Sequence, residues 1–87
     1  MISNNYNLKL NFSVSNGKIF EQRIKNSMKV GELKKYLETK AGLPARKMEM
    51  FHYKTKLADN RTMSSYRVRL NDLITIELKS QGYQQQT

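Results

Sequence analysis

His52 is the only histidine in this sequence and the natural candidate for a catalytic base. Nucleophilic catalysis would need a nucleophile and an orienting acid around it, and no motif marks either partner. The sequence contains no cysteine, so it has no thiol chemistry and no recognisable zinc site. We predict that the protein is not an enzyme and that it uses no metal or other cofactor.

Phosphate binding is not marked by any motif, although the chain is strongly basic. The four glycines, at positions 17, 31, 42 and 82, stand alone and form no phosphate-binding loop. Sixteen Lys and Arg residues against seven acidic residues give a formal charge of +9, which favours an acidic protein surface, a nucleic acid or an anionic membrane as partner. These basic residues are spread along the chain, which is also the pattern of a soluble domain with many solvated lysines.

Length and hydropathy limit the chain to one small domain. Its 87 residues are near the size at which a single core must be well packed to fold alone. No apolar run is long enough to cross a bilayer and the N-terminus has no signal-peptide core, so we expect no membrane partner. The lack of cysteine is compatible with an intracellular location, cytoplasmic or nuclear. The high charge favours a monomer.

Two strands are predicted near the N-terminus. Residues 8–14 alternate between apolar and polar side chains, which is the period of a strand with one buried face. Asn16-Gly17 is a strong signal for a tight turn. Residues 18–24 are therefore expected to form the returning strand of a hairpin.

A helix is predicted from residue 30. One apolar stripe follows helical spacing and consists of Val30, Leu33, Leu37 and Ala41. Ser27 is a possible N-terminal cap, and Gly31 in the first turn costs helix stability. Gly42 is placed to end the helix in a left-handed conformation, and Pro44 prevents its continuation.

The second half of the chain adds a strand region over residues 48–53 and a final strand over 73–78. The order is ββαββ, which predicts a mixed sheet packed on one helix, in the α+β class. We assign residues 7–79 to this domain. Residues 1–6 are expected to be a flexible N-terminal extension, and 80–87 a disordered, Gln-rich tail.

The residues themselves resemble ubiquitin over about residues 8–79. The stretch from Gly42-Leu43-Pro44 to Tyr66 reproduces the spacing of ubiquitin's second half without a gap. The resemblance implies a ubiquitin-like β-grasp fold. Its core would be formed by Leu8, Leu10, Phe12, Val30, Leu33, Leu37, Met50, Leu57, Met63, Val68, Ile74 and Ile76.

Two polar contacts are also implied by the resemblance. Arg61-Thr62 followed by Tyr66 is similar to a ubiquitin loop in which the tyrosine hydroxyl binds a backbone amide. Lys34 and Asp59 match a lysine and an aspartate that form a pair in that family. We expect a partly buried contact between them, with a structural rather than a functional role.

The C-terminal end departs from ubiquitin. Ubiquitin and its conjugated relatives end in two glycines, because only a bare backbone fits the narrow channel of the activating enzyme. The matching residues here are Gly82 and Tyr83, and the sequence contains no Gly-Gly pair. The resemblance therefore implies a domain that is not conjugated to substrates.

The recognition surface departs as well. Ubiquitin binds partners through an apolar cluster on its outer sheet face, and the matching positions here are Ser15, Phe51, Thr75 and Glu77. Only Phe51 keeps a large apolar side chain, so contacts that bury several aliphatic groups are weakened. Phe51 is a candidate hot spot, although its own tail or neighbouring aromatic rings could instead cover it. The predicted partner-binding residues are Lys9, Phe51, His52, Lys54, Thr75, Glu77 and Lys79.

The expected function is protein-protein interaction without chemistry, in which the sheet face docks a larger protein or complex with an acidic surface. Residues 27–34 and 48–51 resemble the ubiquitin-like domains of tubulin-folding cofactors, which also replace the apolar patch and lack the double glycine. A proteasome or chaperone adaptor domain is an alternative. Ser15 and Glu77 argue against it, because those domains generally keep an apolar patch.

RNA binding is the other alternative, because certain splicing-factor subunits end in a basic ubiquitin-like domain. Bases would stack on Phe51, and the phosphates would meet Lys9, Arg46, Lys47, Lys54 and Lys79. The Gln-rich tail lacks the Arg-Gly-Gly-Arg-Lys ending of those domains.

Overall fold

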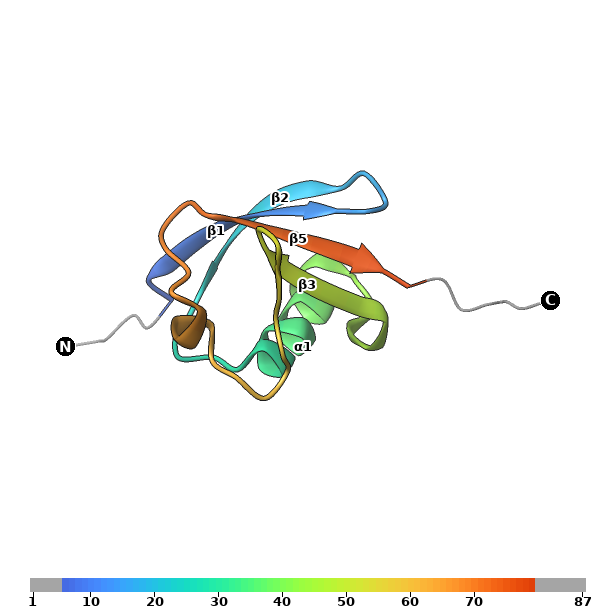
Figure 1. Ribbon diagram of the computed structural model, residues 1–87. Helices are drawn as coiled ribbons and strands as arrows, with labels where there is room; N and C mark the ends of the chain where they lie inside the picture. Colours follow the sequence, from blue (N-terminus) through green and yellow to red (C-terminus); the bar gives the residue numbers. More distant parts are fainter. Residues whose placement is uncertain (1–5, 80–87) are drawn as a thin grey trace.

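The computed structural model describes residues 6–79, which form a curved five-stranded sheet packed on one helix (Figure 1). The strands are β1 (Leu8–Val14), β2 (Ile19–Ile24), β3 (Met48–His52), β4 (Thr55–Lys56) and β5 (Leu73–Leu78). They lie in the order β2-β1-β5-β3-β4. β1 and β5 are parallel, and the other neighbouring pairs are antiparallel. The predicted α+β class and β-grasp topology are confirmed.

The hairpin between β1 and β2 turns where the sequence predicts. Gly17 has a φ of 96°, a left-handed conformation that suits glycine. The side chain of Asn16 accepts a hydrogen bond from the backbone N–H of Lys18 at 2.9 Å. Side chains of β1 alternate between the core and the opposite face of the sheet, as the period-2 pattern requires.

Helix α1 (Val30–Ala41) lies on one face of the sheet (Figure 1). Its predicted end is confirmed, because Gly42 has a φ of 73° and donates its N–H to the carbonyl of Glu38 at 3.2 Å. The predicted cap at Ser27 is wrong. Lys29 is the N-cap residue, and its backbone N–H donates to the carboxylate of Glu32 at 2.9 Å. Ser27 lies too early, inside a turn that precedes the helix.

Gly31 has a packing role that offsets its low helix propensity. Its N–H donates to the carbonyl of Asp59 at 3.0 Å. A Cβ atom at this position would lie 3.4 Å from that oxygen and 3.5 Å from the Cβ of Asp59. The loop after β4 therefore packs directly on the first turn of α1, where a side chain would crowd it.

The core lies between α1 and the sheet, and every core residue expected from the resemblance is buried. Four further core residues extend this set, namely Val14, Ile24, Leu43 and Met48. The residues of the α1 stripe that reach the centre of the core are Val30, Leu33 and Leu37, each with 0% exposure. Ala41, at the end of that stripe, is only partly buried against the core.

The structure differs from the prediction in its short elements. Two 3-10 helices, η1 (Ala45–Lys47) and η2 (Met63–Tyr66), and the two-residue strand β4 were not predicted. Such elements are too short to show a hydrophobic period. β3 ends one residue earlier than expected, because Tyr53 adopts a φ of 57° and leaves the strand.

The expected N-terminal extension and C-terminal tail lie outside the described residues, except for Tyr6. The proposed tail 80–87 and residues 1–5 of the proposed extension are not part of the description. Tyr6, the last residue of that extension, packs its ring 5.5 Å from the ring of Tyr36, and the ammonium of Lys25 lies 5.0 Å from its centroid. The packed part of the chain therefore includes Tyr6, one residue before the predicted boundary.

Candidate protein-binding face

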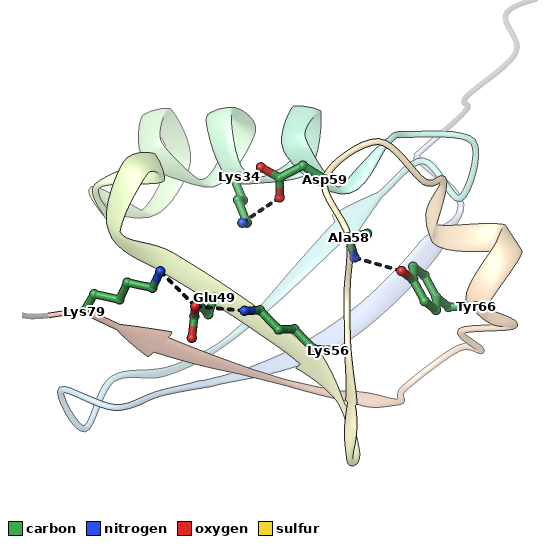
Figure 2. Close-up of polar contacts among 7 residues, drawn as sticks. All are labelled: Lys34, Glu49, Lys56, Ala58, Asp59, Tyr66 and Lys79. Carbon is green, nitrogen blue, oxygen red and sulfur yellow. Dashed lines mark hydrogen bonds and ion pairs between the residues drawn. The ribbon is translucent and has the colours of Figure 1, made fainter.

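Two polar contacts fix the loop that follows β4 (Figure 2). The Lys34 ammonium lies 2.7 Å from Oδ1 of Asp59, and the Tyr66 hydroxyl accepts the backbone N–H of Ala58 at 2.7 Å. Both contacts expected from the resemblance are therefore confirmed. The side chain of Lys34 is 13% exposed and that of Asp59 is 65% exposed, so the lysine is the partly buried member. The first contact holds the loop against α1, and the second holds it against η2.

The face of the sheet opposite α1 carries the outward side chains, and we call it the open face. It consists of Lys9, Asn11, Ser13, Ile19, Glu21, Arg23, Glu49, Phe51, Lys56, Leu73, Thr75 and Glu77. One row crosses all five strands in register, from Ile19 through Ser13, Thr75 and Phe51 to Lys56. Phe51 is half-buried within this row.

Four of the residues predicted to bind a partner lie on the open face. Phe51 pairs with Thr75 across β3 and β5, Glu77 pairs with Glu49, and Lys9 extends from β1 to within 3.9 Å of Glu21. Lys79 follows β5 and reaches the same face through its contact with Glu49. Lys54 lies apart from them, in the turn between β3 and β4.

A small ion cluster surrounds Glu49 on the open face (Figure 2). Its Oε2 lies 2.9 Å from the ammonium of Lys79 and 3.0 Å from that of Lys56. The hydrogen bond from Lys79, followed by that from Lys56, lowers the pKa of Glu49 below its usual value of 4.5. Lys79 is therefore paired with Glu49 rather than a free cation at the rim, although the single carboxylate leaves the cluster with one excess positive charge.

The low pKa of Glu49 predicts a contribution to stability that acid removes. A carboxylate whose pKa is lower in the folded than in the unfolded protein stabilises the fold. This contribution is fully present at pH values above the usual pKa of 4.5. That contribution disappears as the pH falls through the folded pKa. We expect the difference in unfolding free energy between wild type and Glu49→Gln to be largest at neutral pH and to shrink in acid.

Chemical denaturation over a series of pH values measures this difference. Glu38→Gln is the matched control, because Glu38 belongs to none of the ion pairs within residues 6–79. A difference for Glu49→Gln that stays constant between neutral and acid pH would contradict the assignment.

His52 does not lie on the open face with Phe51. Strand alternation turns it to the face opposite Phe51, and its Nε2 lies 2.8 Å from Oδ2 of Asp72. Asp72 also accepts the backbone N–H of Arg69 at 2.9 Å and the hydroxyl of Tyr53 at 3.3 Å. The Arg69 N–H, more than His52 or Tyr53, holds the pKa of Asp72 below its ordinary value. His52 thus ties the end of β3 to the loop before β5.

Sequence reasoning missed two apolar side chains of the open face. Ile19 is 76% exposed and Leu73 is 40% exposed, and Leu73 pairs with Asn11 across β5 and β1. The strict alternation of residues 73–78 could have predicted that Leu73 lies on the open face, because adjacent strand residues point to opposite faces and Ile74 is buried. The position of Ile19 depends on the register of the hairpin.

Positive and negative charges nearly balance on the open face. Its cations are Lys9, Arg23 and Lys56, joined at the edge by Lys79, and its acids are Glu21, Glu49 and Glu77. Four cations thus meet three acids there, whereas the whole chain has sixteen against seven. The excess positive charge therefore lies mainly on other parts of the molecule.

A family model described as a ubiquitin-like domain matches residues 6–80. The match covers most of the chain, which therefore belongs to the ubiquitin-like domain family. A comparison with curated proteins finds no match. Within residues 6–79, no group of three or more His, Cys, Asp or Glu side chains is placed to hold a metal ion. No helix in that same part of the chain is long and apolar enough to cross a membrane.

Proposed function

We propose that this ubiquitin-like domain is a non-catalytic interaction module that is not conjugated to substrates and docks a larger protein or complex through its open face. The position of Phe51 carries this proposal. Phe51 lies in the row that crosses the sheet, and its neighbour across β5 is the short side chain of Thr75. On the far side of Thr75 the row continues with Ser13, which is also short. A partner can approach an aromatic ring flanked in this way.

The open face combines a few exposed apolar side chains, which can contribute binding free energy, with charged side chains around them. Burying a fully exposed side chain of this size contributes about 1.5–3 kcal/mol, so the half-buried Phe51 gains part of this on docking and the more exposed Ile19 gains more. Interfaces concentrate their affinity in a few such residues. The charged side chains around them resemble the polar rim of a transient interface. Such a contact would bury less apolar area than a contact through the apolar patch of ubiquitin.

The proposed partner is a protein with an acidic surface, and the proposed setting is a monomer inside the cell, in the cytoplasm or the nucleus. The resemblance of residues 27–34 and 48–51 to tubulin-folding cofactors makes such a complex the first class to test. An adaptor role at the proteasome or a chaperone ranks lower, because Ser15 and Glu77 replace two apolar positions of the patch.

RNA binding also ranks below protein docking. Stacking on Phe51 would need cations that are available to phosphates, and the near balance of charge on the open face offers few. Lys79 is already held by Glu49. Lys54, in the turn after β3, forms none of the ion pairs within residues 6–79 and remains the strongest candidate for such a contact.

The experiment is affinity capture from the source cell with wild type and Phe51→Ala, followed by measurement of each captured protein. We expect Phe51→Ala to abolish capture, because the anchor of the interface is gone. Leu70→Ala is the matched control, since Leu70 is 57% exposed but lies in the loop before β5.

Capture at full strength by Phe51→Ala would exclude the open face as the docking surface. Salt separates the two candidate functions. Binding to RNA should weaken steeply between about 50 and 200 mM salt because counterions are released from the phosphates, whereas docking anchored by Phe51 should weaken less. Steep salt dependence that Lys54→Glu removes would favour RNA over protein.

A further inference from the structure

A basic groove lies on the helix side of the molecule, away from the open face. It has a volume of about 430 Å³ and is bounded by the start of α1, by η1 and by the loop after β4. Figure 2 shows Lys34 and Asp59 at this junction, with the Glu49 cluster on the sheet below them. The lining of the groove shares no residue with the open face, so the two are separate surfaces.

The lining of the groove has four cations and two acids, so its net charge is positive even though Glu32 keeps its own negative charge. Lys34 is bound to Asp59, and the carboxylate of Glu32 accepts the backbone N–H of Lys29. Three cationic side chains of the lining are exposed and belong to none of the ion pairs within residues 6–79, namely Lys29, Lys35 and Arg46. The groove therefore presents uncompensated positive charge to the solvent.

These side chains, rather than the helix terminus, would bind an anion here. The first amides of α1 are occupied, because Val30 donates to the carbonyl of Arg61 at 2.8 Å and Gly31 donates to that of Asp59 at 3.0 Å. The contacts of the loop after β4 also fix the wall of the groove. These contacts fix the backbone around the hollow, and the three exposed cationic side chains extend from it into the solvent.

We propose that this groove binds an acidic segment of a protein partner, with its Asp and Glu carboxylates paired to Lys29, Lys35 and Arg46. Charge complementarity is the main argument, because clustered cations attract carboxylates and speed association. A nucleic acid fits less well. Surfaces that bind single strands add aromatic platforms to their cations, and the lining of the groove contains no aromatic residue. The proposal does not depend on docking through the open face.

The test uses the full chain and a fluorescein-labelled peptide of alternating Glu and Ser, with binding followed by fluorescence anisotropy at low salt. The double variant Lys35→Glu/Arg46→Glu is expected to lower the affinity at least about tenfold, since it replaces two attractions with two repulsions. The matched control is Lys40→Glu/Arg67→Glu, which makes the same change of charge at exposed positions outside both the groove and the open face. This control should bind nearly as tightly as wild type.

Four results would overturn the proposal. Wild type could fail to bind the peptide at low salt, or the groove variant could bind as tightly as wild type. An equal loss in the control would show that overall charge, and not the groove, attracts the peptide. A labelled oligouridine that binds the groove more tightly than the peptide would assign the groove to RNA. Phe51→Ala should leave peptide binding unchanged, which separates failure of this proposal from failure of docking through the open face.

Discussion

Phe12→Ala is expected to lower the free energy of unfolding by about 3–5 kcal/mol. Phe12 lies at the centre of β1 with 0% exposure, and its ring stacks on that of Phe20 with centroids 5.0 Å apart. Removing it leaves a cavity between sheet and helix that a small domain cannot fill by collapse. Because such domains have total stabilities of about 5–15 kcal/mol, the loss is a large share of the whole.

Urea denaturation measures this loss. If Phe12→Ala does not fold, the milder variant Phe12→Leu still gives a measurable loss of unfolding free energy. Leu fills more of the cavity and should cost clearly less than Ala. Phe51→Ala provides the internal comparison, since the same change is made on the opposite face of the same sheet. We expect it to cost much less stability than Phe12→Ala. Equal losses at the two positions would show that Phe51 supports the core and would argue against its role as a docking residue.

Asp59→Ala is expected to destabilise the protein by about 1–2 kcal/mol, more than Lys34→Met. The side chain of Lys34 is only 13% exposed, so loss of Asp59 leaves a partly buried ammonium without its counterion. Water reaches the 65% exposed Asp59 and screens the pair, so the effect stays below that of a fully buried ion pair. Lys34→Met removes the charge together with the need for a partner, and keeps most of the aliphatic stem in place.

Thermal and urea unfolding of the two single variants and the double variant complete a mutant cycle. Combining the changes should cost little more than Lys34→Met alone. Asn60→Ala is the control for the turn itself, because Asn60 is an exposed neighbour of Asp59. If Lys34→Met proved the more damaging change, the pair would not act as an ammonium and its counterion, and the loop would be held by other contacts.

The regular elements and most of the core could be predicted from local pattern. Alternation in residues 8–14 and the stripe Val30, Leu33 and Leu37 each have a period that only one element satisfies. The resemblance to ubiquitin then supplied contacts that no local pattern contains, such as the pair between Lys34 and Asp59. Ser27 failed as a cap because capping depends on where the backbone enters the helix. A side chain of suitable type two residues earlier cannot replace that geometry.

The candidate sites were less predictable, because a site depends on which strands become neighbours. Phe51 and Thr75 could be placed together only through the match to ubiquitin. The pair between Lys79 and Glu49 links the residue after β5 to β3, which is distant in the chain, so the sequence could not show that a predicted rim cation is paired. His52 was expected beside Phe51 because it is adjacent in sequence. Adjacent residues along a strand point to opposite faces, so His52 points away from Phe51. Its imidazole contacts Asp72 instead.

By itself, the sequence determined a small basic α+β domain in the order ββαββ without a Gly-Gly pair, because hydrophobic period and composition act locally. The β-grasp topology and the full core came from the resemblance to ubiquitin. Only the tertiary structure decided how the charged side chains are distributed over the surface. Folding places nearly balanced charges on the open face and gathers Lys29, Lys35 and Arg46 around one groove. The physical reason is that electrostatic attraction falls with distance in space, and distance along the chain does not determine it.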